Sequence, residues 1–146
     1  MPNIDINILA VLIAVVANFI LGFIWYTPLF GKAWGKEMGY SADKKPPAGA
    51  LAKGMIFMVI GNFLMAYVFA HNMAVWNPLT WGQAASTMSV TETAFSAAFF
   101  TWLGFYFPGE LGRVAWESKS WKLFFINTGY HFASLLLVAM ILAYMY

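Results

Sequence analysis

Five polar side chains lie inside long apolar stretches, where they could hydrogen-bond, hold a proton or bind a small cation. Counted from the ends assigned below to the cytoplasm, Asn18, Asn62 and His131 reach about 12 to 13 Å into the bilayer, and Asn127 lies one helical turn below His131. The one carboxylate lies about 22 Å deep, between two threonines. Polar groups are costly in lipid and should face protein or water. The candidate intramembrane polar site is Asn18, Asn62, Glu92, Asn127 and His131.

Two interpretations of these residues stay open. Asparagine and histidine often join transmembrane helices by hydrogen bonds, which would make them structural. They could instead line a water-filled or ligand-binding site. Glu92 could also reach the outer membrane surface, because the start of its helix is uncertain.

The residue types in this sequence give little support for catalysis or for metal binding. The chain has no cysteine and two histidines, His71 and His131, whose depths differ by about 14 Å, so they are not expected to share a metal. Glu110 and Glu117 lie among basic residues in a predicted connection, where solvated ion pairs are expected. We predict no catalytic residue, no metal and no cofactor, and enzymatic activity is unsupported.

The composition indicates lipid as the solvent of this chain. Hydrophobic residues make up 62% and charged residues 10% of its 146 residues, whereas a soluble domain carries about 25% charged residues. We predict an all-α integral membrane protein, a single transmembrane domain over residues 1–146 with four membrane-spanning helices. The predicted spans are 7–26, 54–75, 90–107 and 123–146.

The basic residues orient these spans. All eight lie in or beside the first and third connections, 27–53 and 108–122. The positive-inside rule places both connections in the cytoplasm and both termini outside. Within them, Lys32, Trp34, Arg113 and Trp116 are expected to contact lipid headgroups, because bases reach phosphate and tryptophan favours the interface.

The two cytoplasmic exits resemble each other. Residues 21–34 read LGFIWYTPLFGKAW and residues 103–116 read LGFYFPGELGRVAW. This similarity favours two helix-loop-helix repeats with parallel topology, related by an axis along the membrane normal. Small residues recur every three or four positions along the first and third spans, so we expect these two helices to pack together near that axis. The alternative is that the small residues form an interface between two copies of the chain.

At these motifs the chain resembles a bacterial membrane family named domain of unknown function 1761. The matching stretches are GFIWYTPLFGKAW at 22–34, WLGF at 102–105 and WKLFFINTGYHFASLLLVAMILAY at 121–144. The resemblance implies a four-helix protein of the bacterial cytoplasmic (inner) membrane. It implies no substrate and no catalytic residue.

The leading functional hypothesis is a small ion or solute channel or transporter that acts as a homo-oligomer, because four helices enclose little room. The alternative is a non-catalytic scaffold or accessory subunit that binds lipid or another membrane protein. An intramembrane enzyme that uses Glu92 or His131 on a lipid is the third. The small net charge of +2 argues against nucleic acid as a partner.

Overall fold

Long apolar helices dominate the computed structural model, which describes residues 4–41 and 43–146. Within that part of the chain, all regular structure is helical. Three of its helices are long and apolar enough to cross a membrane, at Ile8–Leu29, Ala48–Trp76 and Trp121–Tyr144. They correspond to three of the four predicted spans, whereas the predicted span at 90–107 is not among them.

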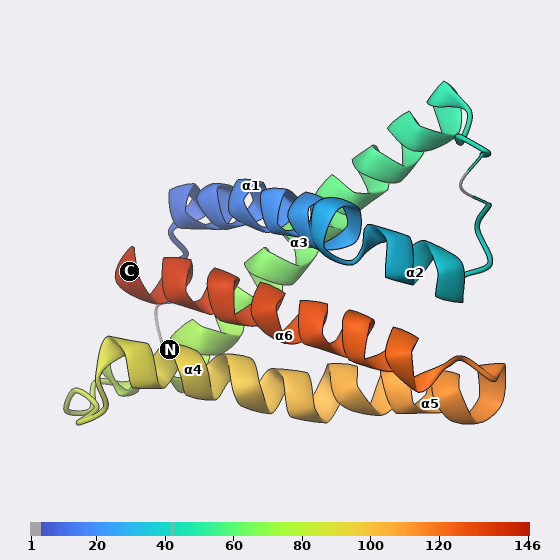
Figure 1. Cartoon of the computed structure of the whole chain (residues 1–146). Coiled ribbons are helices and arrows are strands. Elements are labelled where there is room, and N and C mark those ends of the chain that lie inside the picture. The colour runs from blue at the N-terminus through green and yellow to red at the C-terminus, as the bar shows by residue number, and fades with distance from the viewer. Residues whose placement is uncertain (1–3, 42) are drawn as a thin grey trace.

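The elements follow one another along the chain with short connections (Figure 1). The α-helices are α1 (Ile8–Ile24), α2 (Gly31–Glu37), α3 (Ala48–Trp76), α4 (Val90–Thr101), α5 (Phe107–Glu117) and α6 (Trp121–Tyr144). Two π-helical turns, η1 (Trp25–Leu29) and η3 (Trp102–Tyr106), and one 3₁₀ turn, η2 (Pro78–Trp81), join them.

Much of the two charged connections is helical. α2 and the first turns of α3 lie within residues 27–53, and α5 fills most of residues 108–122. Pro47 immediately precedes α3, where its missing N–H leaves no hydrogen bond unmade. Among the described residues of the first connection, only Phe30, residues 38–41 and residues 43–47 lie outside the helices.

Each π-helical turn accompanies a proline that would otherwise break the helix. Pro28 lies within η1, where the Phe30 amide donates to the Trp25 carbonyl at 2.8 Å. Pro108 is the second residue of α5, two positions after the end of η3. Proline lacks an amide N–H, and its ring collides with the carbonyl four residues back. The wider π turn absorbs this misfit, so α4, η3 and α5 form one unbroken rod.

Helix α6 lies at the centre of the packing, between α1 and the α4–α5 rod (Figure 1). The core consists largely of small side chains, among them Ala10 and Ala14 of α1 and Ala94 and Ala98 of α4. Small residues allow helix backbones to approach closely. The expectation that the first and third spans pack together is wrong, because each packs against α6 instead.

Helix α3 packs along only half of its length. Its buried residues begin at Asn62 and continue to Ala74, whereas every residue from 48 to 61 is exposed. In Figure 1 this first half leaves the bundle as a projecting arm. We call residues 48–61 the α3 arm.

Two glycines set the contact between α1 and α6. A Cβ atom on Gly22 would lie 3.0 Å from the hydroxyl oxygen of Tyr130, and one on Gly129 would lie 3.3 Å from the Trp25 ring. Each helix thus receives an aromatic ring of the other where it lacks a side chain. This reciprocal fit holds the C-terminal end of α1 against the N-terminal half of α6.

Replacement of Gly22 by leucine should therefore separate α1 from α6. We expect Gly22→Leu to destabilise the protein by about 1–3 kcal/mol, the usual cost of overpacking. Thermal unfolding in detergent, followed by tryptophan fluorescence, measures the change. The matched control is Gly61→Leu, because a side chain at Gly61 would meet nothing within 4 Å. Equal melting temperatures for the two variants would contradict the proposed contact.

Candidate functional site

The predicted polar residues fall into two buried groups and one exposed position. Asn18 and Asn62 form a pair between α1 and α3. Asn127 and His131 belong to a second group, built around Glu110 of α5. Glu92 lies apart from both.

Asn18 and Asn62, the amide pair, bridge two helices directly. The Asn18 Nδ2 atom donates to Asn62 Oδ1 at 2.9 Å, and the two residues are only 1% and 8% exposed. Among the described residues, Asn18 Oδ1 and Asn62 Nδ2 find no hydrogen-bond partner. The pair has the geometry expected of a hydrogen bond that joins membrane helices.

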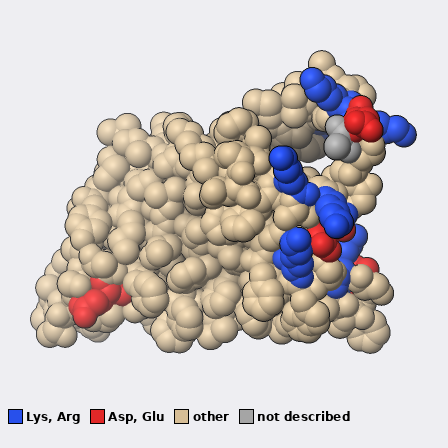
Figure 2. All heavy atoms as spheres, in the orientation of Figure 1, with Lys and Arg blue, Asp and Glu red and all other residues tan. Residues whose placement is uncertain are grey.

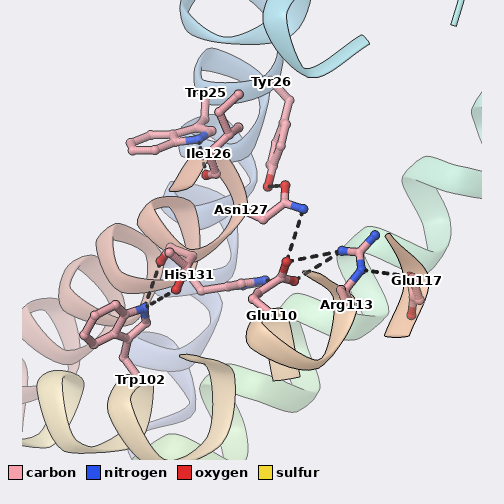
Figure 3. Close-up of polar contacts among 10 residues, drawn as sticks. Trp25, Tyr26, Trp102, Glu110, Arg113, Glu117, Ile126, Asn127 and His131 are labelled. Carbon is pink, nitrogen blue, oxygen red and sulfur yellow. Dashed lines mark hydrogen bonds and ion pairs between the residues drawn. The ribbon is translucent and has the colours of Figure 1, made fainter. Parts of the chain in front are cut away.

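The second group, which we call the Glu110 cluster, surrounds a buried carboxylate (Figure 3). Glu110 is 9% exposed and lies between α5 and α6. The Arg113 guanidinium approaches its Oε1 at 3.3 Å, and Asn127 Nδ2 lies 3.5 Å from its Oε2. His131 Nε2 lies 3.7 Å from Oε1. A buried carboxylate needs such partners, because burial without them costs several kcal/mol.

Tyrosine rings enclose the cluster. The Tyr26 hydroxyl donates to Asn127 Oδ1 at 3.1 Å, which connects the end of α1 to the cluster. The Tyr26 ring meets the Tyr130 ring edge-on, and the Tyr106 ring lies against the His131 imidazole at 4.8 Å between centroids. Each tyrosine buries an apolar ring and carries a polar hydroxyl that can hydrogen-bond.

Two tryptophans fix α1 and the α4–α5 rod against α6. Trp25 and Trp102 each begin a π-helical turn, and each donates its indole N–H to a backbone carbonyl of α6. The acceptors are Ile126 at 3.0 Å and Thr128 at 2.9 Å, on either side of Asn127 (Figure 3). The position of the cluster along α6 is therefore determined by two hydrogen bonds to the helix backbone.

The burial of Glu110 corrects the sequence-based expectation of a solvated ion pair. Nearby bases and the Pro108-Gly109 step suggested a loop, but η3 lets the helix continue through the proline. Glu110 thereby faces α6 instead of water. Its spacing from Arg113, one helical turn away, was the available signal. Glu117 meets the original expectation better, because it pairs with Arg113 at 3.4 Å and stays exposed.

Arg113, expected at the lipid headgroups, is half-buried and serves the cluster. Burial alone would lower the pKa of this guanidinium, but the Glu110 and Glu117 carboxylates outweigh burial and raise the pKa. The Arg113 side chain therefore remains charged. Its charge neutralises that of Glu110.

Glu92 forms a helix cap at the far end of the molecule. Its carboxylate accepts from the Ser89 amide at 2.7 Å, and the Glu92 amide donates to the Ser89 hydroxyl oxygen. The neighbouring Thr91 hydroxyl lies 2.6 Å from that of Tyr144, the last residue of α6. At 1.5 Å per residue, this end lies about 20 Å along α6 from His131. Glu92 is thus not placed with the other predicted site residues.

The remaining predicted interface residues differ in exposure. Trp116 is 90% exposed and Lys32 is exposed, whereas Trp34 packs against the rings of Tyr26 and Tyr40. Figure 2 shows the lysine and arginine side chains gathered at one end of the molecule, over α2, the start of α3 and the α5–α6 turn. The acidic side chains at the opposite end have no bases beside them in this view.

The Glu110 cluster offers a carboxylate, an imidazole and an amide to a ligand. Within residues 4–41 and 43–146, no group of three His, Asp or Glu side chains is placed to hold a metal ion. The arrangement suits a proton that moves between Glu110 and His131, or a small cation that replaces it.

The amide pair generates a test of its structural role. Replacement of either asparagine by leucine leaves the other buried amide without its partner, so each single variant should lose about 1–3 kcal/mol of stability. The double variant should cost less than the sum, with a coupling energy of about 0.5–2 kcal/mol. Thermal or denaturant unfolding of Asn18→Leu, Asn62→Leu and their combination in detergent gives this value. Additive losses would contradict a direct interaction.

Comparison with known proteins identifies a family for the chain but no activity. A family model described as "Protein of unknown function (DUF1761)" matches residues 9–143. No curated protein and no solved structure matches the chain. The match covers nearly the whole sequence, and the chain therefore belongs to the DUF1761 family.

Proposed function

We propose that the chain is a multi-pass protein of the bacterial cytoplasmic membrane that moves protons or small cations, and that it acts as an oligomer. The observation that carries this proposal is the Glu110 cluster, an acid and an imidazole 3.7 Å apart between helices of an apolar bundle. Ionisable groups in such positions are costly and commonly belong to ion pathways and proton relays.

In this proposal α4 is the fourth membrane-spanning helix. It continues through η3 into α5, and the whole rod runs from Val90 to Glu117. At 1.5 Å per residue its length is about 42 Å, more than a hydrocarbon core of about 30 Å requires. The rod would cross the bilayer with Glu110 near the cytoplasmic boundary, where Arg113 can reach water.

A duplicated helix-loop-helix unit accompanies this proposal. Its support is that both exits carry a π-helical turn beside a proline, at Pro28 and Pro108, and that each turn begins with a tryptophan bound to α6. The two turns differ in their register relative to the proline, so a duplication would have diverged at these positions.

An oligomer is proposed because small apolar side chains fill the space between α1, α4 and α6. A polar pathway would therefore run between subunits or along the surface of one. The Glu110 cluster would lie near the cytoplasmic end of such a pathway. Solutes could reach it beside His131 and Arg113, which are partly exposed.

Flux measurements on the purified protein in liposomes test the transport proposal. Proton uptake driven by a potassium gradient and valinomycin should fall about tenfold or more in Glu110→Gln and in His131→Gln, because each removes one of the two side chains that could carry the proton. The matched control is Glu92→Gln, an acid exposed at a helix cap, which should keep its flux. Absence of flux in the unmodified protein, or equal effects of all three variants, would refute the proposal.

The proposed orientation is that α2 and the α5–α6 turn face the cytoplasm, with both termini outside. Its support is the collection of all eight bases at one end of the bundle (Figure 2). Because the chain has no cysteine, single cysteines can report the side directly.

In intact bacterial cells, we expect Ala85→Cys, in the exposed connection before α4, to react with a membrane-impermeant maleimide. Ser41→Cys, in the exposed connection before α3, should react only after permeabilisation. The positive-inside rule is the physical basis of both expectations. The reverse pattern of labelling would overturn the orientation.

A scaffold or accessory subunit is the second candidate, and the α3 arm favours it. This arm exposes apolar side chains on all sides, and none of its residues is buried. Purification in mild detergent discriminates between the two candidates. A stoichiometric foreign membrane protein would support the scaffold, whereas a homo-oligomer with proton flux supports transport.

A further inference from the structure

A wedge opens between α1 and α3 on the side of the lysines. The two helices are joined at Asn18 and Asn62, and Asn62 is the first buried residue of α3. From that point the α3 arm diverges from the bundle, as Figure 1 shows, and the space-filling view in Figure 2 is hollowed between arm and body. The amide pair is therefore the apex of the wedge.

The walls of the wedge are apolar. The arm exposes apolar side chains on all sides, so the face that it turns toward α1 is apolar; its exposed residues include Met55, Ile56, Phe57, Met58, Val59 and Ile60. The opposite wall is the end of α1 beyond Asn18, residues 19–24, which contains no charged residue. The arm has 14 residues from Ala48 to Gly61, or about 21 Å of helix. One leaflet of hydrocarbon is about 15 Å thick, so the wedge has room for the acyl chains of that leaflet.

The mouth of the wedge is strongly basic. Five lysines belong to α2, the following connection and the start of the arm: Lys32, Lys36, Lys44, Lys45 and Lys53. The same segments carry two acids, Glu37 and Asp43, and Glu37 already accepts from the Ser120 hydroxyl at 2.5 Å. In the part of the chain that the structure describes, none of these lysines forms an ion pair.

We infer that this wedge is a binding site for an anionic phospholipid of the lysine-side leaflet. The acyl chains lie between α1 and the α3 arm, and the lysines at the mouth hold the headgroup phosphate. Basic pockets between membrane helices bind anionic headgroups in this manner. The lipid also covers the apolar surface that the arm leaves without protein contacts.

Charge decides between this lipid and a second copy of the chain. A copy that inserted its own α3 arm into the wedge, in the same orientation in the bilayer, would bring its Lys53, and Lys44 and Lys45 just before that arm, against the five lysines at the mouth. Like charges brought together at an interface disfavour that partner, whereas a phosphate neutralises them. The inference does not depend on ion transport, because it uses neither Glu110 nor His131.

Native mass spectrometry of the delipidated full chain in detergent tests the site. Phosphatidylglycerol should bind about tenfold more tightly than phosphatidylcholine with the same acyl chains, because several lysines contribute at the headgroup. The Lys32→Gln/Lys36→Gln/Lys53→Gln variant should lose this preference. The matched control is Lys119→Gln/Lys122→Gln, which removes bases at the α5–α6 turn and should keep it.

Three results would overturn the inference. They are equal binding of the two lipids, loss of the preference in the control variant alone, and equally strong competition by glycerol phosphate, which has the headgroup charge without acyl chains. A lipid-free dimer whose formation excludes phosphatidylglycerol would likewise assign the wedge to a second copy. The melting temperature of each variant, measured in the same detergent, shows that the loss of lipid is not a loss of fold.

Discussion

The contact of α6 with α1 on one side and with the α4–α5 rod on the other is the constraint on which the rest of the fold depends. The carbonyls of Ile126 and Thr128 accept the indole N–H groups of Trp25 and Trp102, and Gly129 leaves room for the Trp25 ring. An indole N–H removed from water needs an acceptor. These two hydrogen bonds therefore set how α1 and the α4–α5 rod are rotated about their own axes and how far each is shifted along α6.

The position of the Glu110 cluster follows from that constraint and from the way two prolines are accommodated. A π-helical turn before Pro108 keeps the rod helical, so Glu110 is carried along α6 to Asn127 and His131. A break at the proline would have sent the same carboxylate into a loop and into water. Backbone geometry thus decides whether this acid is a surface group or part of a buried network.

The amide pair has a different consequence, because it marks where the helices part. Toward one end, α3 packs against α1 from Asn62 onward, and toward the lysines the α3 arm stands free. The bundle is consequently tight where its side chains are small and open where its bases gather. The proposed pathway and the proposed lipid site lie on separate parts of this charged end, one against α6 and the other against α1.

The sequence by itself determined that the chain is helical, where three long apolar helices lie, and that all of its bases fall in two segments. These are properties of composition and spacing along the chain. It also indicated Asn18, Asn62, Asn127 and His131 as interior groups. The spacing of Ser89 and Glu92 is likewise a local capping signature, Ser-x-x-Glu. Only the tertiary structure decided that Glu110 joins Asn127 and His131, and that α6 separates the first and third spans. Those two outcomes depend on π-helical turns and on contacts between distant segments, which local sequence patterns do not encode.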